Sequence, residues 1–479
     1  MTTPLLFSSA FKLNKTQAEL DFVDIPLDAD IPLFVDPFAL SIGASVFSGQ
    51  CHELLVKFFE ELLRAVRTND LDRARELLLH FHEPNETHLG LSSGRPQGAG
   101  IGRQQAEQLL NAFSKSSAVA TGLLTSLEEC ELMIDGIGSD KISDLTTNII
   151  RACLSDYTKE QCELLGIPTQ TAALSPSFDG ASLSWKSQYH QLPVWEKKPV
   201  LLVPKILVRR SHTYDAHDYY ENYVLDYLQQ ELINSNDSLV HSLKNGKRVI
   251  YKKELRNRFP FSKSFLYDFS KNHPDILTRY RKDKTDNKTD PEELISEDQE
   301  VKIALDLKDA LKRVPAGDEK ATLYHHLMMG IIELLFFPNL VHPKREQPIH
   351  DGRKRIDFVM QNAAQDGIFF QLHMTHKIPC PYVMFECKNY TKDPANPEFD
   401  QLGGRFSEKR GKVGFLCFRS TSDEALLIKR CQDTYNDGRG TILPLHDGIV
   451  LQLLDHLVNM RRKNIDLDIG ALLQKIAFS

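Results

Sequence analysis

The fold of the C-terminal part of the chain is decided by one stretch, residues 383–406, which reads VMFECKNYTKDPANPEFDQLGGRF. Its apolar beginning predicts a strand that ends in Glu386 and Lys388. Side chains two positions apart on a strand point to the same face, so we expect these two to lie side by side. Ionised groups are rarely buried unless they are paired or bind a metal. The pattern therefore indicates either a surface salt bridge at a strand end or half of a metal site.

A second acidic residue, Asp357, begins the strand that is predicted in RIDFVMQ, residues 355–361. If this strand pairs with the one that ends in Glu386, the two carboxylates meet at one end of a sheet and repel each other unless a cation lies between them. Mg²⁺, or Mn²⁺ in its place, prefers oxygen ligands and takes one or two carboxylates from a protein. The backbone carbonyl of Cys387 can supply a third oxygen. Lys388 would then activate a metal-bound water and stabilise charge on a phosphate.

The residues around this pair predict alternating helices and strands. Helices are expected at 323–337, 396–410, 422–435 and 448–462, the last of them closing the domain. Strands are expected at 355–361, 367–373, 382–388, 412–420 and 440–445. This alternation predicts a mixed β-sheet that is flanked by helices.

Asp357 on one strand and Glu386-Cys387-Lys388 on the next resemble the PD-(D/E)XK nuclease superfamily, and FECKN and DQLGGRF resemble its Mrr-like and RecB-like members. The resemblance covers residues 320–445 and implies a restriction-endonuclease-like fold. It further implies that Glu333, in the preceding helix, is an additional acid at the sheet end, and that Gln401 supports the site from the following helix. The chain departs from the family pattern in having Ile-Asp where Pro-Asp is usual.

As a function, the resemblance implies a divalent-metal-dependent endonuclease, acting most often on DNA, with Asp357, Glu386, Lys388, Glu333 and Gln401 as catalytic residues and Asp357, Glu386 and Cys387 around the metal. Mrr-like nucleases with large unrelated front domains are often bacterial restriction or antiphage-defence effectors. Two alternatives stay open at this point. One is a catalytically silent nuclease fold that binds DNA or a protein partner, and the other is an RNA-cleaving effector, because a metal-phosphate site ignores the sugar.

Two groups of cations are candidates for contact with nucleic acid. The first follows the motif and consists of Arg405, Lys409, Arg410, Lys412 and Arg419. It either contacts phosphates beside the scissile bond or forms a solvated face.

The second group lies in residues 244–284, which contain thirteen Lys or Arg and four Asp or Glu, together with several Phe and Tyr. Cations that follow phosphates and aromatics that stack on bases suit nucleic acid, and two short helices in this segment fit a helix-turn-helix-like module. Arg279, Arg281 and Lys282 are the candidate contacts. The alternative is a basic surface over an ordinary aromatic core.

The chain has 479 residues, too many for one core, and a multidomain α/β (α+β) protein is expected. We predict a mainly helical α+β domain at 1–165, a basic domain at 166–300 for nucleic acid or a partner, and the nuclease domain with C-terminal helices at 301–479. A protein partner or a homo-oligomer contact through residues 1–300 is also possible on this reading.

The composition predicts a cytoplasmic protein. No apolar run is long enough for a membrane span, and the first residues lack the pattern of a signal peptide. The eight cysteines are scattered without metal or disulfide spacing, which suits a reducing compartment. The loop GLSSGRPQGAGIG, residues 90–102, lacks the Gly-Lys-Ser/Thr ending of a P-loop, so no ATP site is expected.

Overall fold

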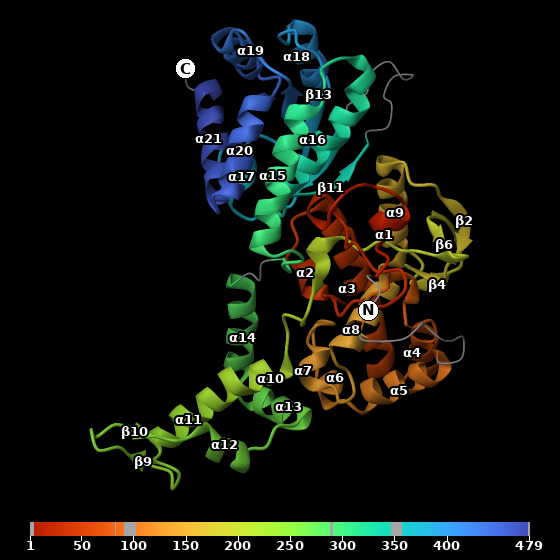
Figure 1. The fold of residues 1–479 in the computed structure, drawn as a ribbon. Helices are drawn as coiled ribbons and strands as arrows, with labels where there is room; N and C mark the ends of the chain where they lie inside the picture. The colour runs from red at the N-terminus through yellow and green to blue at the C-terminus, as the bar shows by residue number, and fades with distance from the viewer. Residues whose placement is uncertain (1–3, 82, 91–101, 288–290, 346–356, 478–479) are drawn as a thin grey trace.

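The structure is a computed structural model that describes residues 4–81, 83–90, 102–287, 291–345 and 357–477 (Figure 1). The glycine-rich loop at residues 90–102, where no ATP site was expected, lies almost wholly outside the described residues. The described residues bury two hydrophobic cores. The first extends from Phe7 to Tyr280. The second extends from Ala304 to Ile476 and takes in Ala18.

The first core is continuous across residue 165, where a domain boundary was predicted. Phe178, Leu192 and Val208 belong to the same buried cluster as Phe58 and Leu154. Residues on both sides of position 165 therefore share one core. The strands after residue 165 are too short to bury a core of their own, so they pack on the preceding helices.

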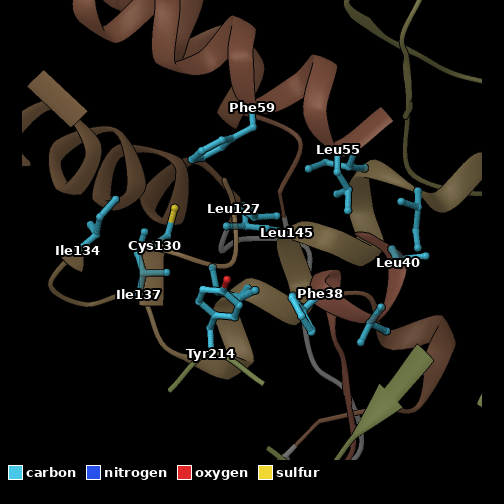
Figure 2. Close-up of a cluster of buried hydrophobic side chains, with 14 of the residues drawn as sticks. Phe38, Leu40, Leu55, Phe59, Leu127, Cys130, Ile134, Ile137, Leu145 and Tyr214 are labelled. Atoms are coloured by element: carbon cyan, nitrogen blue, oxygen red, sulfur yellow. The ribbon is translucent and has the colours of Figure 1, made fainter. Parts of the chain in front are cut away.

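The front module is built on helix α3 (Val46–Arg67), which begins where the Ser45 side chain accepts a hydrogen bond from the Ser48 backbone N–H. Its apolar stripe faces inward, as the sequence periodicity predicts, and Figure 2 shows Leu55 and Phe59 from this helix among buried residues of neighbouring elements. The other helices of the module are α1 (Phe7–Ala10), α2 (Pro37–Ser41), α4 (Leu71–Leu78), α5 (Gly102–Lys115), α6 (Ser117–Thr121), α7 (Cys130–Met133), α8 (Ser139–Ile149) and α9 (Arg151–Leu165).

Short strands and single helical turns complete the front module. The strands pair only in twos, β1 with β8, β2 with β5, β3 with β4 and β6 with β7. Their bounds are β1 (Phe34–Val35), β2 (Gln170–Ala173), β3 (Ser177–Asp179), β4 (Ser184–Lys186), β5 (Tyr189–Leu192), β6 (Val194–Trp195), β7 (Lys198–Pro199) and β8 (Val208–Arg209), and the turns are η1 (Gln17–Glu19), η2 (Asn85–Thr87) and η3 (Lys205–Leu207).

Residues 216–287 form a helical extension that projects from the front module, which we call the arm (Figure 1). A small antiparallel hairpin, β9 with β10, lies at its far end. The aromatic residues of the segment form the interior of the arm: Tyr219 contacts Tyr280, and Tyr227 contacts Phe269. The elements are α10 (Ala216–Tyr219), η4 (Tyr220–Val224), α11 (Leu225–Asn234), β9 (His241–Ser242), β10 (Arg248–Val249), α12 (Lys252–Arg258), α13 (Lys263–Asn272) and α14 (Pro274–Asp286).

The C-terminal module is a five-stranded mixed sheet in the order β11-β12-β13-β14-β15, flanked by helices (Figure 1). The first three strands are antiparallel neighbours, and the last two run parallel to β13. The strands are β11 (Leu340–Lys344), β12 (Phe358–Asn362), β13 (Tyr382–Lys388), β14 (Val413–Phe418) and β15 (Thr441–His446). The helical segments are α15 (Glu297–Arg313), η5 (Asp318–Lys320), α16 (Ala321–Phe336), α17 (Gly367–Met374), α18 (Asn396–Gly403), α19 (Glu424–Asn436), α20 (Asp447–Val458) and α21 (Lys463–Ala477).

Several elements of this module differ from prediction, among them helix α15, which was not expected, and α18, which ends at Gly403 instead of residue 410. Residues 367–373, expected as a strand, form α17, because Ile368, Phe369 and Leu372 are buried with helical spacing. Strand β11 fills the sheet edge where no strand was predicted, and α21 follows the helix that was expected to be the last.

Buried polar contacts join the front module to the edge strand β11. Asp21 accepts hydrogen bonds from the Tyr157 hydroxyl at 2.7 Å and from the His342 backbone N–H at 2.9 Å. Gln161 donates to the Pro343 carbonyl at 2.9 Å. The two modules are therefore held by directional contacts as well as by apolar packing.

Candidate active site

The carboxylates of Asp357 and Glu386 meet at one end of the sheet. Strands β12 and β13 are antiparallel with Phe358 opposite Phe385, so the next position out places Asp357 opposite Glu386. The pairing is closed by a 2.6 Å hydrogen bond from the Cys387 backbone N–H to Asp357 Oδ2. The sheet thus brings together the two acids that the sequence predicted to meet.

Lys388 and Gln401 both contact one oxygen of Glu386. Lys388 Nζ lies 2.7 Å from Glu386 Oε1, and Gln401 Nε2, from α18, donates to the same oxygen at 2.6 Å. Lys388 Nζ also lies 3.4 Å from Gln401 Oε1. Lys388 and Glu386 share a face of β13, as period two predicts, and the helix after the strand supplies Gln401 as the resemblance implied.

The other oxygen of Glu386 is left without a hydrogen bond among the described residues, although its side chain is only 2% exposed. Burial raises the pKa of Glu386, and the neighbouring Asp357 raises it further. Burial also raises the pKa of Asp357, against the Cys387 N–H bond and nearby cations that lower it. An orphaned buried carboxylate oxygen beside a second carboxylate is a setting that a hard cation would stabilise.

Sequence reasoning missed His325, on α16. Its Nδ1 lies 3.3 Å from Asp357 Oδ1, and it also makes a hydrogen bond with the Cys387 backbone. Burial lowers the pKa of His325, which favours the neutral imidazole. The signal available in the sequence was the pair His325-His326 near the start of the predicted helix, two turns ahead of Glu333.

Glu333 is not part of this group, which corrects the prediction that it supplies an acid at the sheet end. It lies eight residues beyond His325 on α16, or about 12 Å along the helix. Its carboxylate is buried and pairs at 3.0 Å with Lys205 of the front module. Burial raises the pKa of Glu333, and Lys205 offsets part of that rise. Its carboxylate is therefore used in a contact between the two modules.

The five cations that follow the motif separate into different places. Arg405 is buried close enough to Asp357 and Glu386 to lower the pKa of both carboxyls. Arg419 lies at the same sheet end as Lys388, but it pairs with Asp447 at 2.8 Å and bonds Asn389, so it braces the fold.

Lys409, Arg410 and Lys412 lie at the opposite end of the sheet. They precede Val413, and β14 runs parallel to β13 with Val413 opposite Val383 and Phe418 opposite Lys388. About 17 Å of strand therefore separates them from Lys388. They follow α18 in an irregular segment closed by the Ser407–Gly411 bridge, and the structure does not bring them to the carboxylates.

A cavity of about 210 Å³ opens beside Asp357. His325, His326, Thr322 and Arg345 supply its polar lining, and Met329, Leu164 and Phe358 its apolar part. No group of three or more His, Cys, Asp or Glu side chains in metal-binding geometry occurs in the part of the chain that the structure describes. The candidate site is therefore a carboxylate pair with adjoining Lys, Gln, His and Arg, open on the Asp357 side.

The predicted nucleic-acid contacts of the arm are partly engaged within the protein. Arg281 pairs with Glu129 of the front module at 2.5 Å, and Arg279 lies over the Tyr223 ring at 5.3 Å. Lys282 is exposed and has no ion-pair partner among the described residues. Tyr267, Phe269 and Tyr280 are buried in the arm interior, as in an ordinary aromatic core, whereas Tyr251 is exposed.

Comparison with known proteins gives one match. A family model described as a domain of unknown function, DUF8370, matches residues 12–215, less than half of the chain. The match ends at Asp215, next to the first residue of α10, so it covers the front module and stops where the arm begins. No curated protein and no solved structure matches the chain.

In the described ranges, no helix is both long and apolar enough to cross a membrane.

Proposed function

We propose that the C-terminal module is a PD-(D/E)XK-type nuclease domain and that the protein is a divalent-metal-dependent phosphodiester hydrolase acting on DNA. The observation that carries the proposal is the group at the sheet end: Asp357 opposite Glu386, with Lys388 and Gln401 bonded to one oxygen of Glu386 and the other oxygen unsatisfied. An antiphage or restriction role in the cytoplasm is the wider setting that this resemblance suggests.

The residues fit Mg²⁺ or Mn²⁺. Asp357 and Glu386 would hold the ion, and such ions need only one or two carboxylates because water and substrate phosphate complete their shell. His325 and the Cys387 carbonyl lie beside the same position, but they already contact each other, so one of them must turn before it could contribute. When bound, the ion would polarise the phosphate and lower the pKa of a water.

The charges of the site favour the binding of a metal ion together with a phosphate group. Two acidic side chains, Asp357 and Glu386, lie beside two basic ones, Lys388 and Arg405, so the opposite charges of the protein groups nearly balance. A divalent ion is therefore best accommodated together with the anionic phosphate that it binds. Lys388 would stabilise the charge that develops on that phosphate and orient the attacking water, while Gln401 fixes Glu386 and Lys388 in place.

The test offers the purified protein duplex DNA, single-stranded DNA and RNA in parallel, with Mg²⁺ or with EDTA. We expect duplex DNA to be cut with Mg²⁺ and spared with EDTA. Glu386→Gln should lower the rate by about 10²-fold or more, because a neutral amide no longer holds the ion. Asp400→Asn is the matched control, since Asp400 lies next to Gln401 on α18 but pairs outward with Arg439. Cleavage by Glu386→Gln at the wild-type rate would rule out this site, and cleavage of RNA alone would move the substrate from DNA to RNA.

A further inference from the structure

The hairpin at the end of the arm carries several exposed lysines. Residues 241–258 contain seven Lys or Arg and one acid, Glu254. Lys252, Arg256 and Arg258 are neutralised by Asp226, Glu221 and Asp237 on the neighbouring part of the arm. Lys244, Lys247 and Lys253 are exposed and make no ion pair with any residue that the structure describes.

Hydrogen bonds to α11 hold the base of the hairpin in place, so the positions of these lysines are defined by the fold. Arg248 donates to the Ile233 carbonyl of α11, and Gln229 of α11 donates to the Ile250 carbonyl at 2.6 Å. Between β9 and β10 the chain reverses through Gly246, whose φ of +76° suits glycine. Lys244 and Lys247 flank this turn, and the exposed ring of Tyr251 and Lys253 at the start of α12 follow directly.

The helices beside the hairpin do not offer the usual recognition helix. Lys263, at the first turn of α13, donates to the Ile134 and Ile137 carbonyls of the front module. Tyr267, on the same helix, contacts Thr121 of that module. The beginning of α13 is therefore covered, whereas the hairpin and the start of α12 present a group of exposed lysines.

We propose that this surface, Lys244, Lys247, Tyr251 and Lys253, grips duplex DNA through its backbone while the distant sheet end acts on it. A nucleic-acid ligand is expected because the proposed function is the cleavage of DNA, and this inference rests on that proposal. B-form DNA is favoured over A-form RNA because a two-stranded ribbon enters the wide DNA groove, whereas the RNA major groove is deep and narrow. Lysine ammonium groups contact phosphates and carry no base information, so we expect the contact to be independent of sequence.

The test measures binding of a labelled short duplex DNA to the full chain in EDTA, so that no cleavage occurs, from about 50 to 300 mM KCl. The triple variant Lys244→Ala, Lys247→Ala, Lys253→Ala should bind more weakly and show a slope of log affinity against log salt that is shallower by up to about three. The corresponding Lys→Arg triple should bind as wild type does. The control triple Lys429→Ala, Lys463→Ala, Lys475→Ala removes equal charge from exposed positions of α19 and α21 and should change little.

The inference is overturned if the arm triple binds DNA as the control triple does, if wild type binds no duplex DNA, or if duplex RNA binds as tightly as DNA through the same lysines. These results differ from failure of the proposed function. If DNA binding needs the arm lysines but no cleavage occurs in Mg²⁺, the nuclease proposal is contradicted and the proposed role of the arm lysines stands. If DNA is cut in Mg²⁺ but the arm lysines do not affect binding, the nuclease proposal stands and the proposal for the arm is overturned.

Discussion

The carboxylate of Glu386 has one oxygen bonded to Lys388 and Gln401 and the other bonded to nothing among the described residues. Strand periodicity placed Glu386 and Lys388 on one face, and the expected pairing of two strands placed Asp357 beside them, whereas Gln401 was expected only from the family resemblance. His325, Arg405 and Glu333 were missed or misplaced for one reason: their roles depend on how α16 and the residues after α18 are set against the sheet, and that is decided by tertiary packing.

The raised pKa of Glu386 makes the stability of the metal-free protein depend on pH. A carboxyl whose folded-state pKa lies above its ordinary value of 4.5 favours the folded state while it is protonated, and this contribution is lost as the pH rises through the folded-state pKa. We therefore expect the melting temperature in EDTA to fall more steeply in wild type than in Glu386→Gln as the pH rises above the ordinary carboxyl value of 4.5. Thermal unfolding of both proteins across this range measures the difference. If the melting temperatures of the two proteins change with pH in parallel, ionisation of Glu386 does not destabilise the folded state.

Among the elements, α14 joins the arm to the front module through Arg281. The guanidinium contacts Glu129, whose side chain is 3% exposed, and donates to the Leu123 carbonyl. The sequence showed Arg279, Arg281 and Lys282 as one basic cluster, because composition does not reveal which cation faces inward. The sequence predicted most strands and helices of the sheet module, since their apolar periodicity is strong. It did not predict the edge strand β11, which pairs with β12 and also contacts the front module.

Arg281→Ala should destabilise the docking of the arm, since it leaves Glu129 buried without its cation. The expected cost is about 1–3 kcal/mol. Hydrogen exchange should become faster in α14 and around residues 123–129, while Lys282→Ala, which removes an exposed cation one residue later, should leave exchange unchanged. Equal exchange in the two variants would mean that the Arg281 pair does not hold the arm.

On the scale of the whole molecule, the modules are joined by the Glu333–Lys205 pair and by the Asp21 contacts to β11. These groups are buried, so the DUF8370-like front module and the sheet module form a tightly packed junction.

Glu333→Gln should weaken this junction and leave the chemistry of the sheet end intact. Breaking this buried pair leaves Lys205 buried without its nearest carboxylate, at a cost of up to about 3 kcal/mol. Calorimetry should show a lower melting temperature, with Glu319→Gln, an exposed acid just before α16, as the unaffected control. Cleavage of DNA at 25 °C should remain within about twofold of wild type. A loss of cleavage as large as that of Glu386→Gln would return Glu333 to the active site.

The central claim, that Asp357 and Glu386 form a divalent-cation site served by Lys388, is tested most directly by calorimetric titration of Mn²⁺ into wild type, Glu386→Gln and Lys388→Ala. We expect a saturable binding isotherm in wild type and its loss in Glu386→Gln, because the amide cannot replace the carboxylate ligand. Lys388→Ala should bind Mn²⁺ at least as tightly as wild type, since it removes a neighbouring positive charge, while its DNA cleavage falls by about 10²-fold or more. An unchanged isotherm in Glu386→Gln, or a collapse of Mn²⁺ binding in Lys388→Ala, would contradict the assignment.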